Sequence, residues 1–463
     1  MSIIDKYLEI ESNKELYQHI FSYKNVLMYP FIRHFLLQRT IENVQGLPPG
    51  YDPLHVSAIQ KAKYAIKSFW YRLPKKIQSN IVFFGSDISN IRIGESYFNR
   101  LTESFANEYP TETVLIELSD KMDYKRPRTY PKVFTNDFLN VVAKIKSKLT
   151  PVNSKDIEQI DSFMQLLRQN FNYEFSNNEV WYNIKNMLID FSKKLPFLFD
   201  EYVKLLKNLS PKVIFLEDAC YGGRNIPLIL AAKELKIPVG EYQHGLISLS
   251  HPAYNYSDKL SDCYKWYMPD FYMSYGKYWM ENSRIPLKII ELGNPYLFDV
   301  ISQCGKTIKK EQMLYISEAQ TPEYYVKEVI WLNRNLADIG CSVIFRIHPS
   351  ETSRLQTVYR PIIDAGIQID MQPLYDTLKC TKYIVGDFST VLFEAVSFDC
   401  FIFVRDTSSN RENIDISHFN NIQSLEELVE NIKLKKYKKT EPIDFWADNW
   451  RIKYHNLIDN NMF

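Results

Sequence analysis

Glycine is scarce in this chain: 14 of its 463 residues are glycine, and no Gly-rich phosphate loop is present. The P-loop and the dinucleotide-binding fingerprint both depend on several closely spaced glycines, so both are excluded. The sequence also has no isolated Asp-x-Asp motif. A phosphate-binding site, if the chain has one, must therefore be built from side chains and from the first turns of helices.

Disulfides, long apolar runs and excess charge are also missing. The six cysteines are scattered without a C-x-x-C pair, which is typical of reduced thiols in a cytosolic protein. No stretch approaches the roughly 18 apolar residues of a membrane span, and no secretory signal pattern opens the chain. The formal net charge is +1, so no overall field favours nucleic acid. We expect a cytoplasmic protein without a nucleic-acid partner, whose membrane contact would be peripheral.

Strand-like and helix-like segments alternate along most of the chain. Residues 1–75 are predicted to be helical, with a loop at 46–53. Strands and helices alternate in residues 76–300, apart from a helical insertion at about 135–208, and alternate again in residues 301–440. Residues 441–463 are predicted to form an amphipathic terminal helix. This pattern predicts two doubly wound, Rossmann-like α/β domains that face a central cleft. We expect the terminal helix to return to the first domain.

Two local predictions concern the first domain. The segment between the strands at 81–85 and 113–118, which contains Tyr97, Asn99 and Arg100, reads as a helix. Arg33 and His34 lie on an N-terminal helix, where a position on the helix surface is favoured over contact with a ligand.

A strand–turn–helix–strand unit at 382–404 is the main phosphate-site candidate. Gly386 ends a β-rich run, Ser389 and Thr390 open a helix, and Glu394 lies one turn inside it. The start of a helix offers unpaired N–H groups and partial positive charge to a phosphate, and Glu394 could reach a ribose hydroxyl. The alternative is that Ser389 or Thr390 is only an N-cap.

The stretch at 341–351 adds a second set of polar residues. Its strand ends with Arg346, His348 and Ser350 around a proline, and Ser317, followed by Gln320, closes an earlier strand. Ligands of open parallel sheets bind beyond the carboxyl ends of strands, so these side chains and the 382–404 unit should face one crevice. Two phosphate-type sites on one crevice indicate a nucleotide-sugar donor.

The first domain carries candidate catalytic groups at two strand ends. Glu217 and Asp218 follow the strand at 212–216, and His244 follows the strand at 237–242. An acidic pair at such a position suits a general base; the alternative is one helix cap and one solvated acid. We assign acceptor contacts to the polar, aromatic and glycine residues nearby, namely Tyr221, Gly222, Gly245, His251 and Tyr254.

Taken together, these motifs resemble a known group. The pair Glu217-Asp218, the triplet Gln243-His244-Gly245, His348-Pro349 and Ser389-Thr390 are similar, in this order, to motifs of GT-B type bacterial capsule and lipopolysaccharide glycosyltransferases related to polysialyltransferases, sialyltransferases and Kdo transferases. A similar His-Pro and Ser-Ser/Thr pair occurs in teichoic-acid glycerophosphotransferases. The resemblance covers about residues 80–405.

The resemblance implies a GT-B fold and an inverting transfer from a nucleotide-linked sugar, with a CMP-linked sialic acid or Kdo-like sugar favoured, to a hydroxyl of a growing bacterial surface glycan or glycolipid. It makes Glu217 or Asp218 the base and places His348, Ser389 and Thr390 on the donor phosphate. In the sialyltransferase-type motif glycine follows the acids directly, whereas Ala219-Cys220-Tyr221 intervene here. The choice of base therefore stays open among Glu217, Asp218 and His244. We expect no metal and no other cofactor.

Three other functions stay open: a nucleotide-sugar 2-epimerase, a teichoic-acid-type glycerophosphotransferase and a non-catalytic partner in polysaccharide assembly. The lysine-rich run at 433–439 could attract the anionic cytoplasmic face of the inner membrane, or could simply be solvated. The lysines at 144–148 are read as a solvated face.

Overall fold

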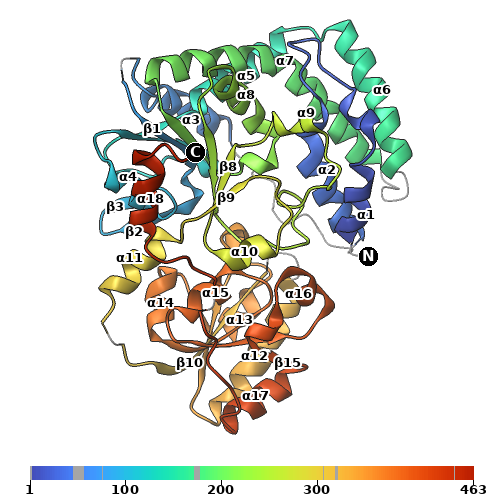
Figure 1. The fold of residues 1–463 in the computed structure, drawn as a ribbon. Helices are drawn as coiled ribbons and strands as arrows, with labels where there is room; N and C mark the ends of the chain where they lie inside the picture. The colour runs from blue at the N-terminus through green and yellow to red at the C-terminus, as the bar shows by residue number, and fades with distance from the viewer. Residues whose placement is uncertain are drawn as a thin grey trace.

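A computed structural model describes residues 3–44, 57–75, 77–171, 178–305, 307–318, 322–442 and 444–463. Its strands form two parallel sheets, one in each half of the chain, and the two halves lie one above the other (Figure 1). The first sheet has the order β5 (Val133–Thr135), β4 (Thr113–Leu118), β1 (Ile81–Ser86), β6 (Val213–Leu216), β7 (Val239–Tyr242), β8 (Phe271–Ser274) and β9 (Lys288–Glu291). The second has the order β12 (Gln368–Ile369), β11 (Ser342–Arg346), β10 (Lys310–Ile316), β13 (Thr381–Gly386), β14 (Phe401–Arg405) and β15 (Asn420–Ile422).

Helices cover both faces of each sheet. The first half carries α1 (Ile3–Ile10), α2 (Tyr29–Val44), α3 (Ala58–Trp70), α4 (Glu103–Glu108), α5 (Asp137–Leu149), α6 (Ser154–Phe171), α7 (Asn178–Leu209), α8 (Ile226–Glu234), α9 (Asp262–Lys265), α10 (Lys277–Glu281) and α11 (Pro295–Gln303). The second half carries α12 (Pro322–Ala337), α13 (Arg360–Asp364), α14 (Leu374–Cys380), α15 (Thr390–Val396), α16 (Ser408–Asn413) and α17 (Leu425–Lys433), and the terminal helix is α18 (Trp450–Asp459).

Side chains along a buried strand alternate between two cores. In β1, Val82 and Phe84 join the core under α7 and α8, whereas Ile81 and Phe83 join the core under α4 and α18. Successive side chains of a strand point to opposite faces, and in a parallel sheet both faces are covered, so the strand is apolar throughout. The predicted fold, two doubly wound α/β domains in the GT-B arrangement, is confirmed.

The chain returns to the first half at its C-terminus, as expected. Helix α18 lies beside α4 of the first half (Figure 1). Trp450 and Tyr454 of α18 pack against Phe105 of α4, with ring centroids 5.6 and 4.9 Å from that of Phe105. The helix begins only at Trp450, later than the predicted start near residue 441. Trp446 lies before the helix and contacts Tyr275 and Trp279 instead.

An aromatic cluster joins the two halves. Tyr278 and Trp279 of α10 pack against Phe393 of α15, with ring centroids 5.2 and 4.7 Å away. Phe445, from the segment that returns to the first half, lies 5.0 Å from Phe393 and 4.9 Å from Tyr278. The two sheets are therefore connected by shared buried rings as well as by the chain.

The prediction of a helix around Tyr97 and Asn99 is wrong. These residues lie in β3 (Ser96–Asn99), which forms an antiparallel hairpin with β2 (Asn90–Ile93). Gly94, at φ 59°, supplies the left-handed turn that the hairpin needs. Asn99 is buried and its amide donates to the backbone oxygen of Ser86, so tertiary contacts outweigh the helical pattern.

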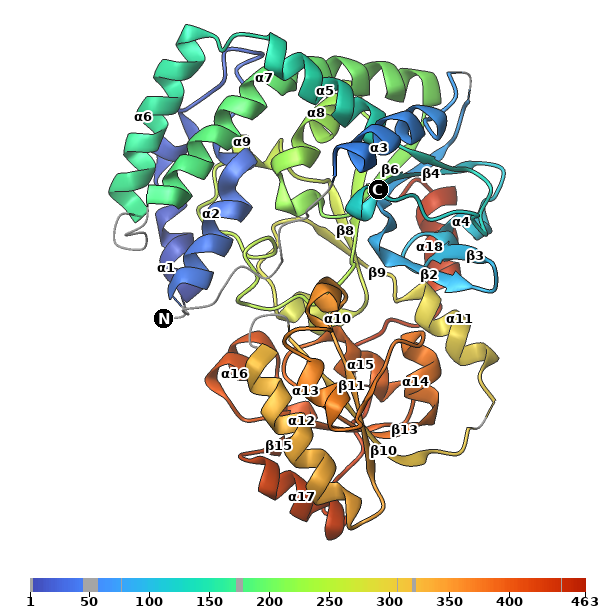
Figure 2. The same cartoon turned by 180° about the vertical axis from the view of Figure 1, so that it is seen from behind.

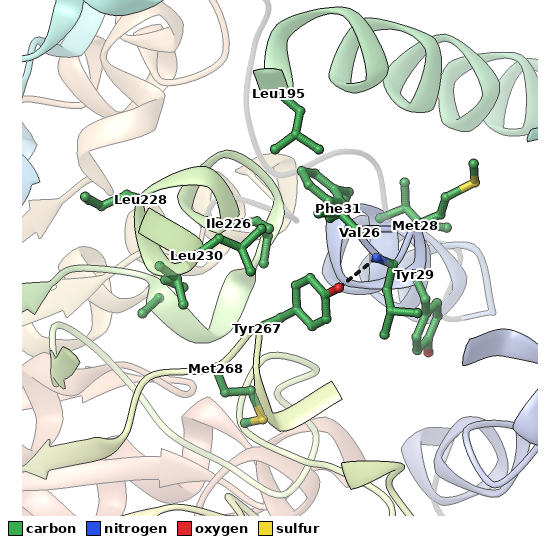
Figure 3. Packing of buried hydrophobic residues seen from close by; sticks show 14 of the residues in the cluster. Val26, Met28, Tyr29, Phe31, Leu195, Ile226, Leu228, Leu230, Tyr267 and Met268 are labelled. Carbon is green, nitrogen blue, oxygen red and sulfur yellow. Dashed lines mark hydrogen bonds between the residues drawn. The ribbon is translucent and has the colours of Figure 1, made fainter. Parts of the chain in front are cut away.

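The N-terminal segment is packed into the first half. Phe31 packs against Phe191 of α7, with ring centroids 4.8 Å apart, and Met28 and Tyr29 belong to the same buried cluster. The hydroxyl of Tyr267 accepts a hydrogen bond from the backbone N–H of Leu27 at 2.8 Å (Figure 3). The loop expected at 46–53 falls outside the described residues. No helix in the described ranges combines the length and apolarity needed to cross a bilayer.

Arg33 is fully buried and does not lie on a helix surface as predicted. Its guanidinium pairs with the buried carboxylate of Glu11 and donates to the backbone oxygens of Pro252 and Asn255, both at 2.6 Å. The guanidinium also lies 4.0 Å from the ring centre of Tyr256. One side chain thus fixes α2 to the loop after β7.

Arg33→Met should lower the free energy of unfolding by about 3–5 kcal/mol, because it leaves the carboxylate of Glu11 buried without its partner. Lys24→Met, which removes one member of an exposed pair with Glu234, should cost less than about 1 kcal/mol. Urea unfolding followed by circular dichroism measures both. Equal losses in the two variants would contradict the role given to Arg33.

Candidate functional site

Asp218 and His244 lie within hydrogen-bond distance of each other at the carboxyl ends of β6 and β7. Asp218 Oδ1 lies 3.1 Å from His244 Nε2, and the Asp218 side chain is 24% exposed. Asp218 has φ 60°, the left-handed conformation that Asp and Asn tolerate better than most residues and that costs free energy. The backbone therefore holds the carboxylate in place, while its other oxygen, Oδ2, lies 3.6 Å from the exposed guanidinium of Arg224.

Glu217 lies beside Asp218 in a different environment. It is nearly buried, and its Oε2 accepts a hydrogen bond from the backbone N–H of Ser86 at 2.7 Å. Burial, and then the negative charge of Asp218, raise the pKa of Glu217 to about 8. The two adjacent acids are thus distinguished: Glu217 holds its proton at neutral pH, and Asp218 is the accessible one.

A fully buried third carboxyl lies behind His244. The hydroxyl of Tyr254 donates to Glu241 Oε1 at 3.0 Å and lies 3.5 Å from His244 Nδ1. The backbone N–H of Cys220 donates to Glu241 Oε2 at 2.7 Å. Burial raises the pKa of Glu241 to about 8. Both ring nitrogens of His244 therefore have neighbours, Asp218 on one side and Tyr254 on the other.

Two more histidines surround Tyr221. The ring centroid of His34, from α2, lies 4.1 Å from that of Tyr221, and the hydroxyl of Tyr221 lies 3.2 Å from His251 Nε2. Burial, and then the charge of Arg33, lower the pKa of His34 to about 4; burial also lowers the pKa of His251 well below its usual value. Both imidazoles are neutral at pH 7 and can give and accept hydrogen bonds, as a hydroxyl-bearing ligand requires.

The two predicted acceptor glycines have different surroundings. A Cβ on Gly222 would come within 2.3 Å of the backbone oxygen of Pro30, and Gly222 has φ 66°. Its lack of a side chain is needed for packing against α2. Gly245 has open space where a side chain would be, and its backbone oxygen accepts from the Gln243 amide at 2.9 Å.

In the second half, Ser317 and His348 meet around a buried acid. The hydroxyl of Ser317 donates to Glu351 Oε2 at 2.6 Å, and the backbone N–H of His348 lies 3.1 Å from Ser317 Oγ and 3.0 Å from the same carboxylate oxygen. This arrangement fixes the end of β11 and leaves the His348 imidazole at the edge of the sheet. Desolvation lowers the pKa of His348, so the ring is neutral at pH 7.

Arg346 is also placed at this edge. Its guanidinium pairs with Asp370 at 2.6 Å and donates to the backbone oxygen of Gln372 at 2.9 Å. Ser350 lies in a short 3-10 helix, Pro349–Arg354, and its side chain falls outside the described residues, as does Gln320.

The start of α15 combines capping and packing. Ser389 Oγ accepts a hydrogen bond from the backbone N–H of Val391 at 3.3 Å, so Ser389 is the N-cap of this seven-residue helix and Thr390 is its first residue. Gly386 is buried, with Ile316 and Leu392 3.3–3.4 Å from the position of a Cβ. Ser389 therefore makes the N-cap contact that the alternative interpretation predicted.

Glu394 and Arg100 connect the two half-sites. Arg100, which follows the β2–β3 hairpin, lies 3.6 Å from Glu394 Oε1, while Glu394 Oε2 is buried without a hydrogen-bond partner among the described residues. Burial raises the pKa of Glu394 despite the neighbouring guanidinium. Tyr275, at the end of β8, lies within electrostatic reach of Arg100, Glu394 and Glu217.

The structure brings together residues that the sequence motifs did not connect. Four residues at the site were not among the predicted site residues: His34, Glu241, Arg100 and Tyr275. Glu241 carries the one available signal, since a carboxylate inside a strand buried on both faces needs a special reason. Among the described residues no cluster of three or more His, Cys, Asp or Glu side chains is arranged to hold a metal ion.

No protein-family model and no curated protein matches the sequence. Solved structures with a related chain path include a UDP-GlcNAc 2-epimerase from Methanocaldococcus jannaschii, with TM-score 0.47, 13% identity, and coverage of 82% of this chain and 99% of that one. Others are a putative UDP-N-acetylglucosamine 2-epimerase from Listeria monocytogenes (TM-score 0.46, 11% identity, 83% and 98% covered) and a UDP-forming α,α-trehalose-phosphate synthase from Burkholderia xenovorans (0.44, 8%, 83% and 100%). Structural similarities with TM-scores below 0.5 and such low sequence identity carry no information about substrate or reaction.

Proposed function

We propose that the protein is an inverting, metal-independent glycosyltransferase that moves a sugar from a nucleotide donor to a hydroxyl of a bacterial surface glycan or glycolipid. The observation that carries this proposal is the accessible carboxylate of Asp218, held in a left-handed conformation and paired with His244 at 3.1 Å. Inversion by direct displacement needs one base beside the acceptor hydroxyl and a stabilised leaving group on the other side.

Asp218 is the base in this proposal. Its Oδ1 is engaged by His244, and its Oδ2, which pairs with the exposed guanidinium of Arg224 at 3.6 Å, would take the acceptor proton. Glu217 is unsuited to the task, because it is buried, bonded to Ser86 and protonated at neutral pH. His244 orients the carboxylate, and Tyr254 and Glu241 in turn orient His244.

The donor belongs at the carboxyl edge of the second sheet. Several residues at the ends of three neighbouring strands would contact the donor phosphate: Arg346, His348 and Ser350 after β11, Ser317 after β10, and Ser389 and Thr390 after β13. Glu394 would contact the ribose. The guanidinium of Arg346 supplies positive charge, and hydroxyl and imidazole groups supply hydrogen bonds, as charge builds on the leaving phosphate. A CMP-linked donor is favoured by the motif resemblance alone.

Neutral groups around Tyr221 suit the acceptor. Tyr221, His34 and His251 offer hydrogen bonds without charge. Gly245 leaves open space beside His244. An uncharged acceptor hydroxyl would therefore meet the base in a site that binds polyols.

Nucleotide binding tests the donor half of the proposal. In a thermal-shift screen with CMP, CDP, UDP, GDP and ADP, CMP should raise the melting temperature equally with and without EDTA; a hundredfold excess over Kd stabilises by about 2.7 kcal/mol. His348→Ala should reduce the shift, whereas His455→Ala on α18 should keep it. Loss of every shift would contradict a nucleotide-dependent enzyme, and a shift abolished by EDTA would contradict metal independence.

Release of CMP from CMP-sialic acid tests the base. Asp218→Asn should lower turnover by about 10²–10⁴-fold while keeping the melting temperature, because Asn also tolerates the left-handed conformation. Glu217→Gln should keep most of the activity, since Glu217 is already protonated. An Asp218→Asn variant as fast as the parent would show that another group, His244 first, is the base.

Stability should depend on pH through Glu241. Its pKa is about 8 when folded and 4.5 when exposed, so the folded state holds a proton that the unfolded chain has lost. The free energy of unfolding should therefore fall as pH rises from 5 to 8, by up to about 1.4 kcal/mol per pH unit for this group. Glu241→Gln should make the profile less steep in urea unfolding, and Glu234→Gln on the surface should not. An unchanged slope in Glu241→Gln would contradict a protonated Glu241.

A further inference from the structure

Helix α3 turns its apolar side to solvent. Ser68 is buried against the domain and Tyr64 and Ala65 are half-buried, whereas Ile59, Ile66 and Trp70 on the opposite side are 69%, 68% and 79% exposed. These three residues are spaced seven and four apart, so they form one stripe along the helix. The usual orientation of an amphipathic helix is reversed here.

Helix α5 extends this apolar surface. It lies beside α3 on the outside of the first half (Figure 2), and the rings of Phe69 and Phe138 are 5.5 Å apart. Ile145 and Leu149 follow Phe138 at seven and eleven residues, which places them on the same side of α5 as this contact. Their side chains are 56% and 80% exposed. We call the exposed side of α3 and α5 the α3–α5 face.

The exposed charged residues of these two helices are all basic, and Asp137 at the start of α5 is buried. Three lysines lie on α3 and three on α5, all exposed: Lys61, Lys63, Lys67, Lys144, Lys146 and Lys148. The sequence has no Asp or Glu at 57–75 or at 138–149, although the whole chain is balanced at 56 basic and 55 acidic residues. Within the described part of the chain no carboxylate pairs with any of the six lysines.

We propose that the α3–α5 face docks on a bilayer that contains anionic lipids. Trp, Phe, Ile and Leu side chains enter the boundary between headgroups and acyl chains, and lysines around them are attracted to anionic headgroups. A second copy of the chain fits less well, because a two-fold contact would bring two lysine-rich faces together without an acid. Nucleic acid offers no place for the exposed Ile, Leu and Trp side chains.

The C-terminal lysine run is a natural control. Lys439 pairs with Asp399 at 2.9 Å, and the ring of Tyr437 packs against Phe401 with centroids 4.4 Å apart. This run is basic but has little exposed apolar surface besides Leu434. A comparison of this run with the α3–α5 face therefore distinguishes membrane attraction by charge alone from attraction by charge combined with apolar side chains.

Flotation of the full chain with vesicles tests the proposal. The protein should float with phosphatidylcholine vesicles that contain about one-third phosphatidylglycerol, should float less at high salt, and should stay in solution with pure phosphatidylcholine. Ile66→Ser combined with Trp70→Ser should lower the bound fraction about tenfold or more, as should Lys63→Gln combined with Lys67→Gln. Lys435→Gln combined with Lys436→Gln should float like the parent.

Three outcomes would overturn the proposal: no flotation of the parent with anionic vesicles, loss of flotation only in the C-terminal variant, or a dimer in light scattering that the Ile66/Trp70 variant abolishes. The third outcome would identify the face as a contact between copies. Because all the changed residues are exposed, melting temperatures should stay close to that of the parent. The nucleotide shift should also be unchanged, so this proposal and the proposed function can fail separately.

Discussion

The buried guanidinium of Arg33 is the contact on which the geometry of the site depends. Through Glu11 it joins the first two helices, and through the backbone oxygens of Pro252 and Asn255 it holds the loop that carries His251 and Tyr254. An unpaired charge at this depth would be costly, so the loop has one favourable position relative to α2. The same helix brings His34 to Tyr221, and Pro30 to Gly222. The N-terminal helices are thus part of the site.

Burial gives chemically identical groups different roles. Glu241 and Glu217 lie out of water, where the neutral form of a carboxyl is favoured, whereas Asp218 is partly exposed. The same effect keeps His34 and His251 neutral. The partly exposed carboxylate of Asp218 therefore has neutral histidines and protonated acids on its buried side and the guanidinium of Arg224 on its exposed side. In this arrangement one carboxylate is available to accept a proton, which is why the proposed mechanism assigns one base.

Strand ends were the most predictable feature of the chain. Apolar strands followed by Glu217, His244, Ser317 or Arg346 could be recognised locally, because a parallel strand is apolar along its whole length and its polar neighbours lie at its carboxyl end. Contacts between distant segments could not be recognised in this way. Arg33 and Arg100 are ordinary basic residues in sequence, and only the fold brings them to Glu11 and Glu394. The β2–β3 hairpin was missed for a related reason, since Asn99 is held by partners from other strands.

The aromatic cluster of Tyr278, Trp279, Phe393 and Phe445 has a consequence for cooperativity. Rings from both halves are buried in one another, so separating the sheets would expose a large apolar area to water. Opening of one half would therefore expose apolar surface of the other and should destabilise it. A ligand held by only one sheet would accordingly stabilise both, and the molecule would respond to heat as a single body.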